Sequence, residues 1–177
     1  MHNVIKVCEW ATEMLNKVGI ELGPVPLKVL KPILDGAALE EDEEIQELWA
    51  ALLANAGGGA EPGTVSPAYP AILRQLSPND AKVMRALFEI AKTKASPERE
   101  LGGTIELHLE HFPAYTDLEF MDIMASLHHH SLIERHEFVT ETASTKIGEH
   151  TFRIIHFGGR FIRACEPPKR SDLRTHR

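Results

Sequence analysis

The sequence predicts a mainly α-helical protein, α+β overall. An N-terminal helical bundle over residues 1–65 precedes a winged-helix-like unit over 66–165 and a basic tail over 166–177. Three observations predict this order. Apolar residues recur at helical spacing through the first third of the chain, and later a helix cap is followed by two β-rich segments. The charge also changes at the glycine-rich connector 55–63, from −7 before residue 66 to −2 over the second unit and +2 over the tail.

Composition narrows the class of protein before any motif is considered. The chain has 177 residues, 43% apolar and 25% charged, which is typical of a soluble globular domain. No apolar run approaches the roughly 18 residues that a membrane span needs. Two cysteines are too few for a disulfide framework, so the expected compartment is the cytoplasm. The net charge of −7 disfavours non-specific binding to nucleic acid.

Two amphipathic helices are predicted at the N-terminus. The first ends near Gly19 or Gly23 and carries an apolar stripe of Val4, Cys8, Ala11, Leu15 and Val18. The second begins near Pro26, because proline suits the first turn of a helix. Pro32 should kink this helix or mark its true beginning. The predicted apolar stripe of the second helix is Leu27, Leu30, Ile33, Leu34 and Ala38.

The third helix has the clearest local pattern. Its apolar residues follow the spacing of a core-facing helix: Ile45, Leu48, Trp49, Leu52 and Leu53. Five acidic residues, 40–44, precede them and would stabilise the positive end of the helix dipole. This acidic run is interpreted first as a capped, solvated helix start. The alternative is a cation site or a contact for a basic partner, made by an acidic edge of Asp42, Glu43, Glu44 and Glu47.

Two Ser-Pro pairs open the next helices, since a serine hydroxyl caps a helix and proline fits its first position. Ser66-Pro67 predicts a short helix through Ile72 and Leu73. Ser77-Pro78 predicts a longer one carrying Val83, Leu87 and Ile90, followed by a loop over 94–104.

A capping box, Thr116-Asp117-Leu118-Glu119, then opens a helix that runs to about His130. Segments 132–139 and 151–157 are rich in β-branched and aromatic residues, with a polar connector between them. They predict a β-hairpin, and the order helix, connecting segment, helix, hairpin is that of a winged helix.

The helix over 117–130 does not resemble a DNA-reading helix. Its predicted inner face is Leu118, Phe120, Met121, Met124 and Leu127, and the outer positions are Glu119, Asp122, Ser126 and His129. DNA-reading helices carry Arg, Lys, Asn or Gln at such positions. Two carboxylates here would face a polyanion, and Lys146 in the connector lies near Glu141 and Glu149. The basic tail is the main feature in favour of DNA, so DNA binding stays open but disfavoured.

Catalytic and metal-binding motifs are incomplete. His128, His129 and His130 are consecutive and point about 100° apart on a helix, so they would not share one ion. His136-Glu137 lacks the second histidine of a zinc-protease motif, and no CxxC spacing occurs. The glycine run lacks the Lys of a phosphate loop, and a Gly-x-Ser-x-Gly elbow is absent. The sequence therefore predicts no metal, no cofactor and no catalytic residue.

The segment 24–56, from Pro24-Val25-Pro26-Leu27 to Leu53-Ala54-Asn55-Ala56, resembles the signature block of the abortive infection alpha family. Ser66-Pro67 with 76–82 is similar to the next block, and 159–165 to the C-terminal block. The resemblance covers roughly residues 19–165. It implies a prokaryotic cytoplasmic protein associated with defence against phage, and it brings no catalytic residues with it.

Three functions follow as hypotheses. The first is a non-enzymatic interaction protein that contacts a protein partner, or a further copy of itself, through the outer positions of the 117–130 helix and the acidic edge. The second is a winged-helix transcriptional regulator. The third is a toxin-like hydrolase whose site assembles only in the fold, around His108, Glu110 and His111.

Overall fold

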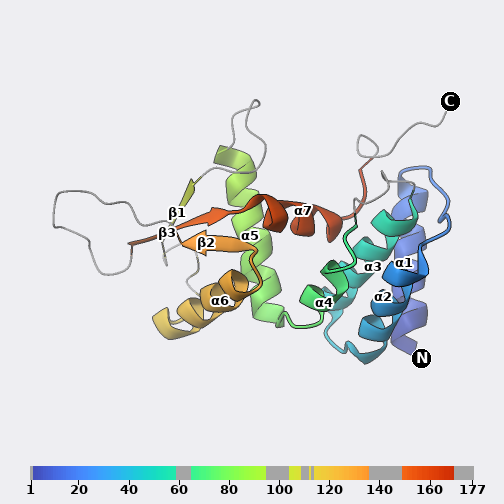
Figure 1. The fold of residues 1–177 in the computed structure, drawn as a ribbon, viewed down its shortest axis with the longest axis horizontal. Helices are drawn as coiled ribbons and strands as arrows, with labels where there is room; N and C mark the ends of the chain where they lie inside the picture. Colours follow the sequence, from blue (N-terminus) through green and yellow to red (C-terminus); the bar gives the residue numbers. More distant parts are fainter. Residues whose placement is uncertain are drawn as a thin grey trace. The chain divides into compact units, whose positions relative to one another are not determined.

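The computed structural model describes residues 2–58, 65–94, 104–108, 112, 114–135 and 149–169. The chain divides into two compact units, Met1–Pro78 with Arg160–Arg177, and Asn79–Gly159 (Figure 1). The short helix after Ser66-Pro67 and the described residues from Arg160 to Lys169 thus group with the N-terminal helices. The sequence had predicted a single unit over 66–165.

The described residues form seven helices and three strands, which confirms the mainly α, α+β class. The first unit holds α1 (His2–Lys17), α2 (Leu27–Leu39), α3 (Glu43–Gly57) and α4 (Tyr69–Leu73). The second holds α5 (Pro78–Lys94), β1 (Thr104–His108), α6 (Asp117–His129), β2 (Ile133–Arg135) and β3 (Glu149–Ile154). Helix α7 (His156–Ala164) begins in the second unit and ends in the first. None of the described helices is long and apolar enough to cross a membrane.

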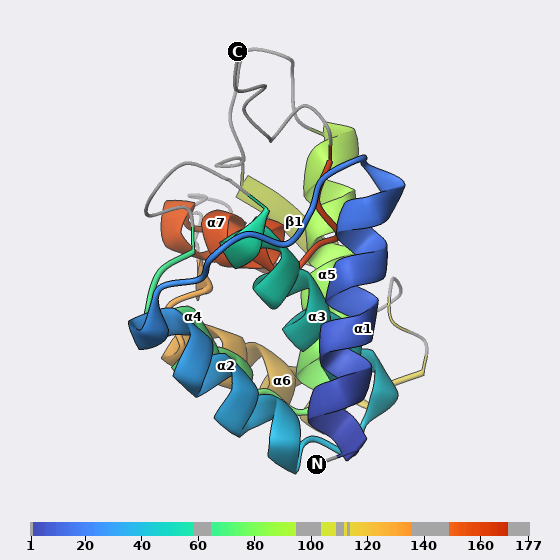
Figure 2. The same cartoon turned by 90° about the vertical axis from the view of Figure 1, so that its right-hand side faces the viewer.

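Helix α3 forms the centre of the first unit. It packs against both α1 and α2, and Figure 2 shows it alongside α1. All five predicted core residues of α3 are at most 2% exposed. Asp42 caps the helix, since its Oδ1 accepts a hydrogen bond from the Ile45 amide at 3.0 Å. The predicted capped helix with a core-facing row is confirmed, but α3 is amphipathic only in its first turns, because every residue from Leu48 to Asn55 is buried.

Helices α1 and α2 are confirmed, but their buried faces are shifted. Helix α1 buries Val7, Ala11 and Leu15, and the chain turns at Gly19 with a φ of +78°. Helix α2 buries Val29, Ile33, Gly36 and Ala37, so the predicted stripe was wrong except at Ile33. Leu27 is 78% exposed. Pro32 lies inside α2 and does not mark its beginning.

Gly36 explains why α2 turns this face inward. A Cβ atom at Gly36 would collide with the ring of Trp49, which is fully buried on α3. The glycine therefore lets α2 approach the tryptophan closely, and contact with this large ring favours the small-residue face over the leucines.

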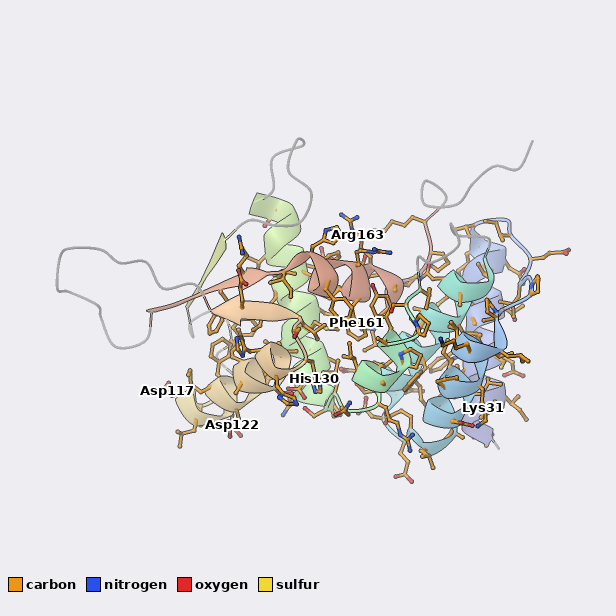
Figure 3. The ribbon with its side chains drawn as sticks, viewed as in Figure 1. Lys31, Asp117, Asp122, His130, Phe161 and Arg163 are labelled. Carbon is orange, nitrogen blue, oxygen red and sulfur yellow. The ribbon has the colours of Figure 1, made fainter. Side chains whose placement is uncertain are left out.

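The second half of α7 completes the first unit. Asn55 of α3 is buried, and its Nδ2 donates to the carbonyl oxygens of Ala164 at 3.0 Å and Glu166 at 2.8 Å. Phe161, labelled in Figure 3, packs edge-on against Tyr69 with ring centroids 5.4 Å apart. This end of the chain is therefore held by side chains from α3 and α4.

The second unit is built on a three-stranded antiparallel sheet in the order β1-β3-β2. The predicted hairpin is confirmed: β2 pairs with β3, with Ile133 opposite Ile154. The predicted connector, 140–150, was too long, because Glu149 and His150 belong to β3 and pair with β1. Its other residues, 140–148, lie outside the described residues. The loop prediction over 94–104 missed β1, which begins at Thr104 and pairs with β3.

Two further predictions in this unit need correction. The second predicted strand ends at Ile154 rather than Phe157, because α7 begins at His156. Leu118 and Met121 of α6 are 80% and 38% exposed, so they do not belong to the inner face. Ile123 takes that place with Phe120, Met124 and Leu127. The winged-helix assignment itself remains a prediction.

Candidate interaction surfaces

The outward side of α6 combines apolar and acidic side chains. We define the α6 outer face as five exposed residues: Leu118, Met121, Asp122, Ala125 and His129. Figure 3 shows Asp117 at the N-terminal end of this helix and Asp122 on its outer side. Of the predicted site residues on α6, Glu119, Asp122 and His129 are exposed and Ser126 is half-buried. The sequence did not predict an exposed leucine beside carboxylates, because the apolar pattern assigned Leu118 to the inner face of the helix.

The capping box sets where α6 begins, and its buried residues set which side chains point outward. Thr116 and Glu119 form a reciprocal capping box: the Glu119 amide donates to Thr116 Oγ1, and the Thr116 amide donates to Glu119 Oε2 at 2.9 Å. With the core on Phe120 and Leu127, Leu118 is turned about 200° from Phe120 and faces outward. The exposed leucine is thus a consequence of the helix's registration on the sheet.

Glu119 caps the N-terminus of α6 together with Thr116. Its carboxylate accepts hydrogen bonds from the backbone amide and the hydroxyl of Thr116, and these lower the pKa of Glu119 below its ordinary value. The charge of Glu119 is therefore held in the cap, and Asp117 and Asp122 are the carboxylates that flank the apolar residues.

Two residues of the acidic edge of α3 make contacts that stabilise the fold. Asp42 is the cap, and Glu43 Oε1 accepts from Lys6 Nζ at 2.6 Å. Lys6 Nζ also lies 4.4 Å from the ring centroid of Trp10, a cation–π distance. Glu44 and Glu47 are exposed. Part of the predicted edge thus fixes α1 on α3, which favours the helix-start interpretation for Asp42 and Glu43.

A second outward apolar row lies on α2. We define the α2 outer face as Leu27, Leu30, Leu34 and Ala38; Leu27 and Ala38 are exposed, and Leu30 and Leu34 are half-buried. Lys28 and Lys31 lie beside Leu27, and Lys31 pairs with Asp35 four residues on. These four apolar residues come from the stripe that periodicity assigned to the core. Their exposure makes α2 a candidate surface that sequence reasoning missed.

The histidines at the end of α6 do not form a metal site with the residues around them. The rings of His129 and His130 meet edge-on, with centroids 5.2 Å apart. Burial lowers the pKa of His130; His129 lowers it further, and Asp80 opposes the shift. Across the described residues there is no group of three or more His, Cys, Asp or Glu side chains that could hold a metal ion. The side chain of His108 and residues 110 and 111 lie outside the described residues.

Comparison with known families gives the context of these surfaces. The family model described as abortive infection alpha matches residues 5–165. The chain belongs to the abortive infection alpha family. The matched region includes both outer faces, so each is part of the abortive infection alpha domain. No curated protein and no solved structure matches the chain significantly.

Proposed function

We propose that this abortive infection alpha protein is a non-enzymatic component of a prokaryotic phage-defence system, and that it acts in the cytoplasm through protein–protein contacts made by the α6 outer face. The acidic edge of α3, through Glu44 and Glu47, is a subsidiary contact. Membership of the family supports the role in abortive infection.

The observation that carries the contact is the exposure of Leu118, at 80%, next to Asp122. An exposed leucine by itself is ordinary. Here Met121 and Ala125 extend it along one side of a helix at the i, i+3, i+7 spacing with which amphipathic helices enter partner grooves. The flanking carboxylates would keep this face soluble in the free protein and select a partner by charge.

Plaque counts test the proposal. A host that expresses the wild-type chain should give fewer plaques than an empty-vector host for at least some phages in a diverse panel. Leu118→Glu should abolish the protection, because a carboxylate replaces the central apolar side chain. Leu39→Glu is the matched control, since Leu39 is 69% exposed at the end of α2 and lies outside both outer faces. It should protect like wild type.

Two outcomes contradict the proposal. Plaque counts equal to those of the empty vector across the panel would remove the defence role. Full protection by Leu118→Glu, with expression and circular dichroism matching wild type, would remove the α6 outer face from the mechanism.

A DNA titration tests the regulator alternative. Fluorescence anisotropy of a labelled random duplex should show no binding even at low salt, because Asp117, Glu119 and Asp122 repel phosphate. Binding that weakens steeply as salt rises would instead favour a winged-helix regulator, since release of counterions gives that dependence.

A further inference from the structure

We infer that the α2 outer face binds the α2 outer face of a second copy, antiparallel and across a two-fold axis, so that the chain forms a dimer. All residues of this contact belong to the first unit. The inference goes beyond the proposed function, because the contact uses none of the α6 residues.

The apolar row of α2 is complementary to itself when its direction is reversed. Leu27 is 78% exposed in the first turn, and Ala38 is exposed in the last turn. A two-fold axis through the middle of the row, perpendicular to the helix, places Leu27 of each copy opposite Ala38 of the other. Leu30 then lies beside Leu34 of the second copy. A large side chain meets a small one at both ends of the contact, which lets the two helices interdigitate.

The charged residues of α2 are complementary in the same arrangement. At about 100° per residue, Lys28, Lys31 and Asp35 lie within about 60° of one another, on one flank of the apolar row. The two-fold axis keeps this flank on the same side in both copies and reverses its direction. Asp35 of the second copy then falls between Lys28 and Lys31 along the helix axis, at a rise of about 1.5 Å per residue. Each Asp35 carboxylate is thus flanked by two ammonium groups, which is the complementarity of a specific interface.

The ion pair within each chain is compatible with this contact. Lys31, labelled in Figure 3, pairs with Asp35 of its own chain, and both side chains are exposed. A carboxylate accepts hydrogen bonds from more than one donor, so Asp35 can keep this pair and bind a second cation. Lys28 is exposed and makes no ion pair with the residues that the structure describes. The dimer therefore adds a Lys28–Asp35 pair twice and breaks none. A parallel pairing would instead bring like charges together.

Leu27→Glu tests the apolar part of the contact. The two-fold axis makes the substitution act twice, so dimerisation should weaken at least about 100-fold, because burying one leucine is worth about tenfold or more in an equilibrium constant. Leu118→Glu is the matched control, since Leu118 is 80% exposed and lies on α6. It should leave the dimer unchanged.

Sedimentation velocity of the full chain measures the dimer. A contact of one helix from each copy is small, so the dimer should be weak and the concentration series should extend to about 1 mM protein. The wild-type chain should sediment as a dimer at the upper end of this series.

A mixture of two charge variants tests the antiparallel arrangement. Asp35→Lys leaves only cations on the flank, and Lys28→Glu with Lys31→Glu leaves only anions, so each variant alone should sediment as a monomer. An equimolar mixture should form a heterodimer, because the cations of one chain face the anions of the other in both halves of the contact. The like charges at positions 31 and 35 within each chain are unchanged by mixing. Recovery therefore reports the contact between chains and not the ion pair within one.

Four outcomes overturn the inference. The first is a wild-type chain that stays monomeric up to about 1 mM. The second is a dimer that survives Leu27→Glu, and the third is a dimer that is lost in Leu118→Glu. The fourth is a mixture of the two charge variants that stays monomeric although each has the circular dichroism of wild type.

Discussion

Asn55 is the side chain on which the strongest stability prediction rests. It is 8% exposed, and its Nδ2 donates to three carbonyl oxygens: Ala51 at 3.0 Å, Ala164 at 3.0 Å and Glu166 at 2.8 Å. Ala164 is the last residue of α7, where carbonyl groups have no partner within the helix, and Glu166 lies two residues beyond it. One amide therefore joins α3 to a segment more than 100 residues away in sequence.

Asn55→Ala should destabilise the protein by about 2–4 kcal/mol, because a buried polar group left without its partner costs about 1–3 kcal/mol and two carbonyls lose theirs. At a typical urea dependence of about 2 kcal/mol/M, the midpoint of unfolding should fall by about 1–2 M. Asn55→Asp should cost at least as much near neutral pH. Its carboxylate donates no hydrogen bond and would place a negative charge against two carbonyl oxygens.

Urea unfolding followed by tryptophan fluorescence measures the loss, and hydrogen exchange locates it. Amides of residues 161–166 should exchange faster in Asn55→Ala than in wild type, while those of α5 should not change. Asn16→Ala is the matched control, because Asn16 is exposed on α1. An ordinary surface substitution changes the free energy of unfolding by at most about 0.5 kcal/mol. If Asn55→Ala changes it by no more than that, the hydrogen bonds of Asn55 do not stabilise the protein as argued.

Three further predictions concern packing, capping and protonation. Gly36→Ala should cost about 1–3 kcal/mol by overpacking against Trp49, measured by urea unfolding. Thr116→Ala should lower the free energy of unfolding by about 1 kcal/mol and Thr116→Ser by much less, because serine keeps the cap. The stabilisation that Glu119 gives this cap is fully present above its ordinary pKa of 4.5. It should be lost as the pH falls through the lowered pKa of Glu119 in the folded protein. The pKa of His130 in the folded protein lies below its ordinary value of 6.5, so protonation of His130 favours unfolding. The free energy of unfolding should therefore fall as the pH drops below 6.5. An NMR titration checks the pKa, and His130→Gln should remove this part of the pH dependence.

Elements with strong local patterns were predictable. Helix α3 has a cap, an acidic first turn and a row of large apolar residues at core-facing spacing, so its local and tertiary preferences agree. The capping box located the start of α6, and β-branched residues located the hairpin. Strand β1 was missed although Ile105 and Leu107 alternate with polar residues, because the pattern covers only five residues and its partner, β3, lies more than 40 residues away.

Helix α7 was missed for a different reason. Its first turn reads His156-Phe157-Gly158-Gly159, and each glycine costs a helix about 1 kcal/mol relative to alanine. Tertiary packing reverses this preference, since a Cβ atom at Gly158 would collide with the carbonyl group of Leu132. The glycine that argues against a helix in isolation is what allows the helix to lie here.

Helices α2 and α6 show why periodicity located the elements better than their buried faces. In α2 the leucine row is the stronger apolar pattern, yet the weaker row with Gly36 is buried, because it admits the Trp49 ring. In α6 the choice of Ile123 over Leu118 depends on how the helix sits on the sheet. The packing that buries Gly36 of α2 and Ile123 of α6 turns Leu27 and Leu118 outward, so the exposure of these two leucines is set by tertiary contacts and not by the apolar pattern of either helix.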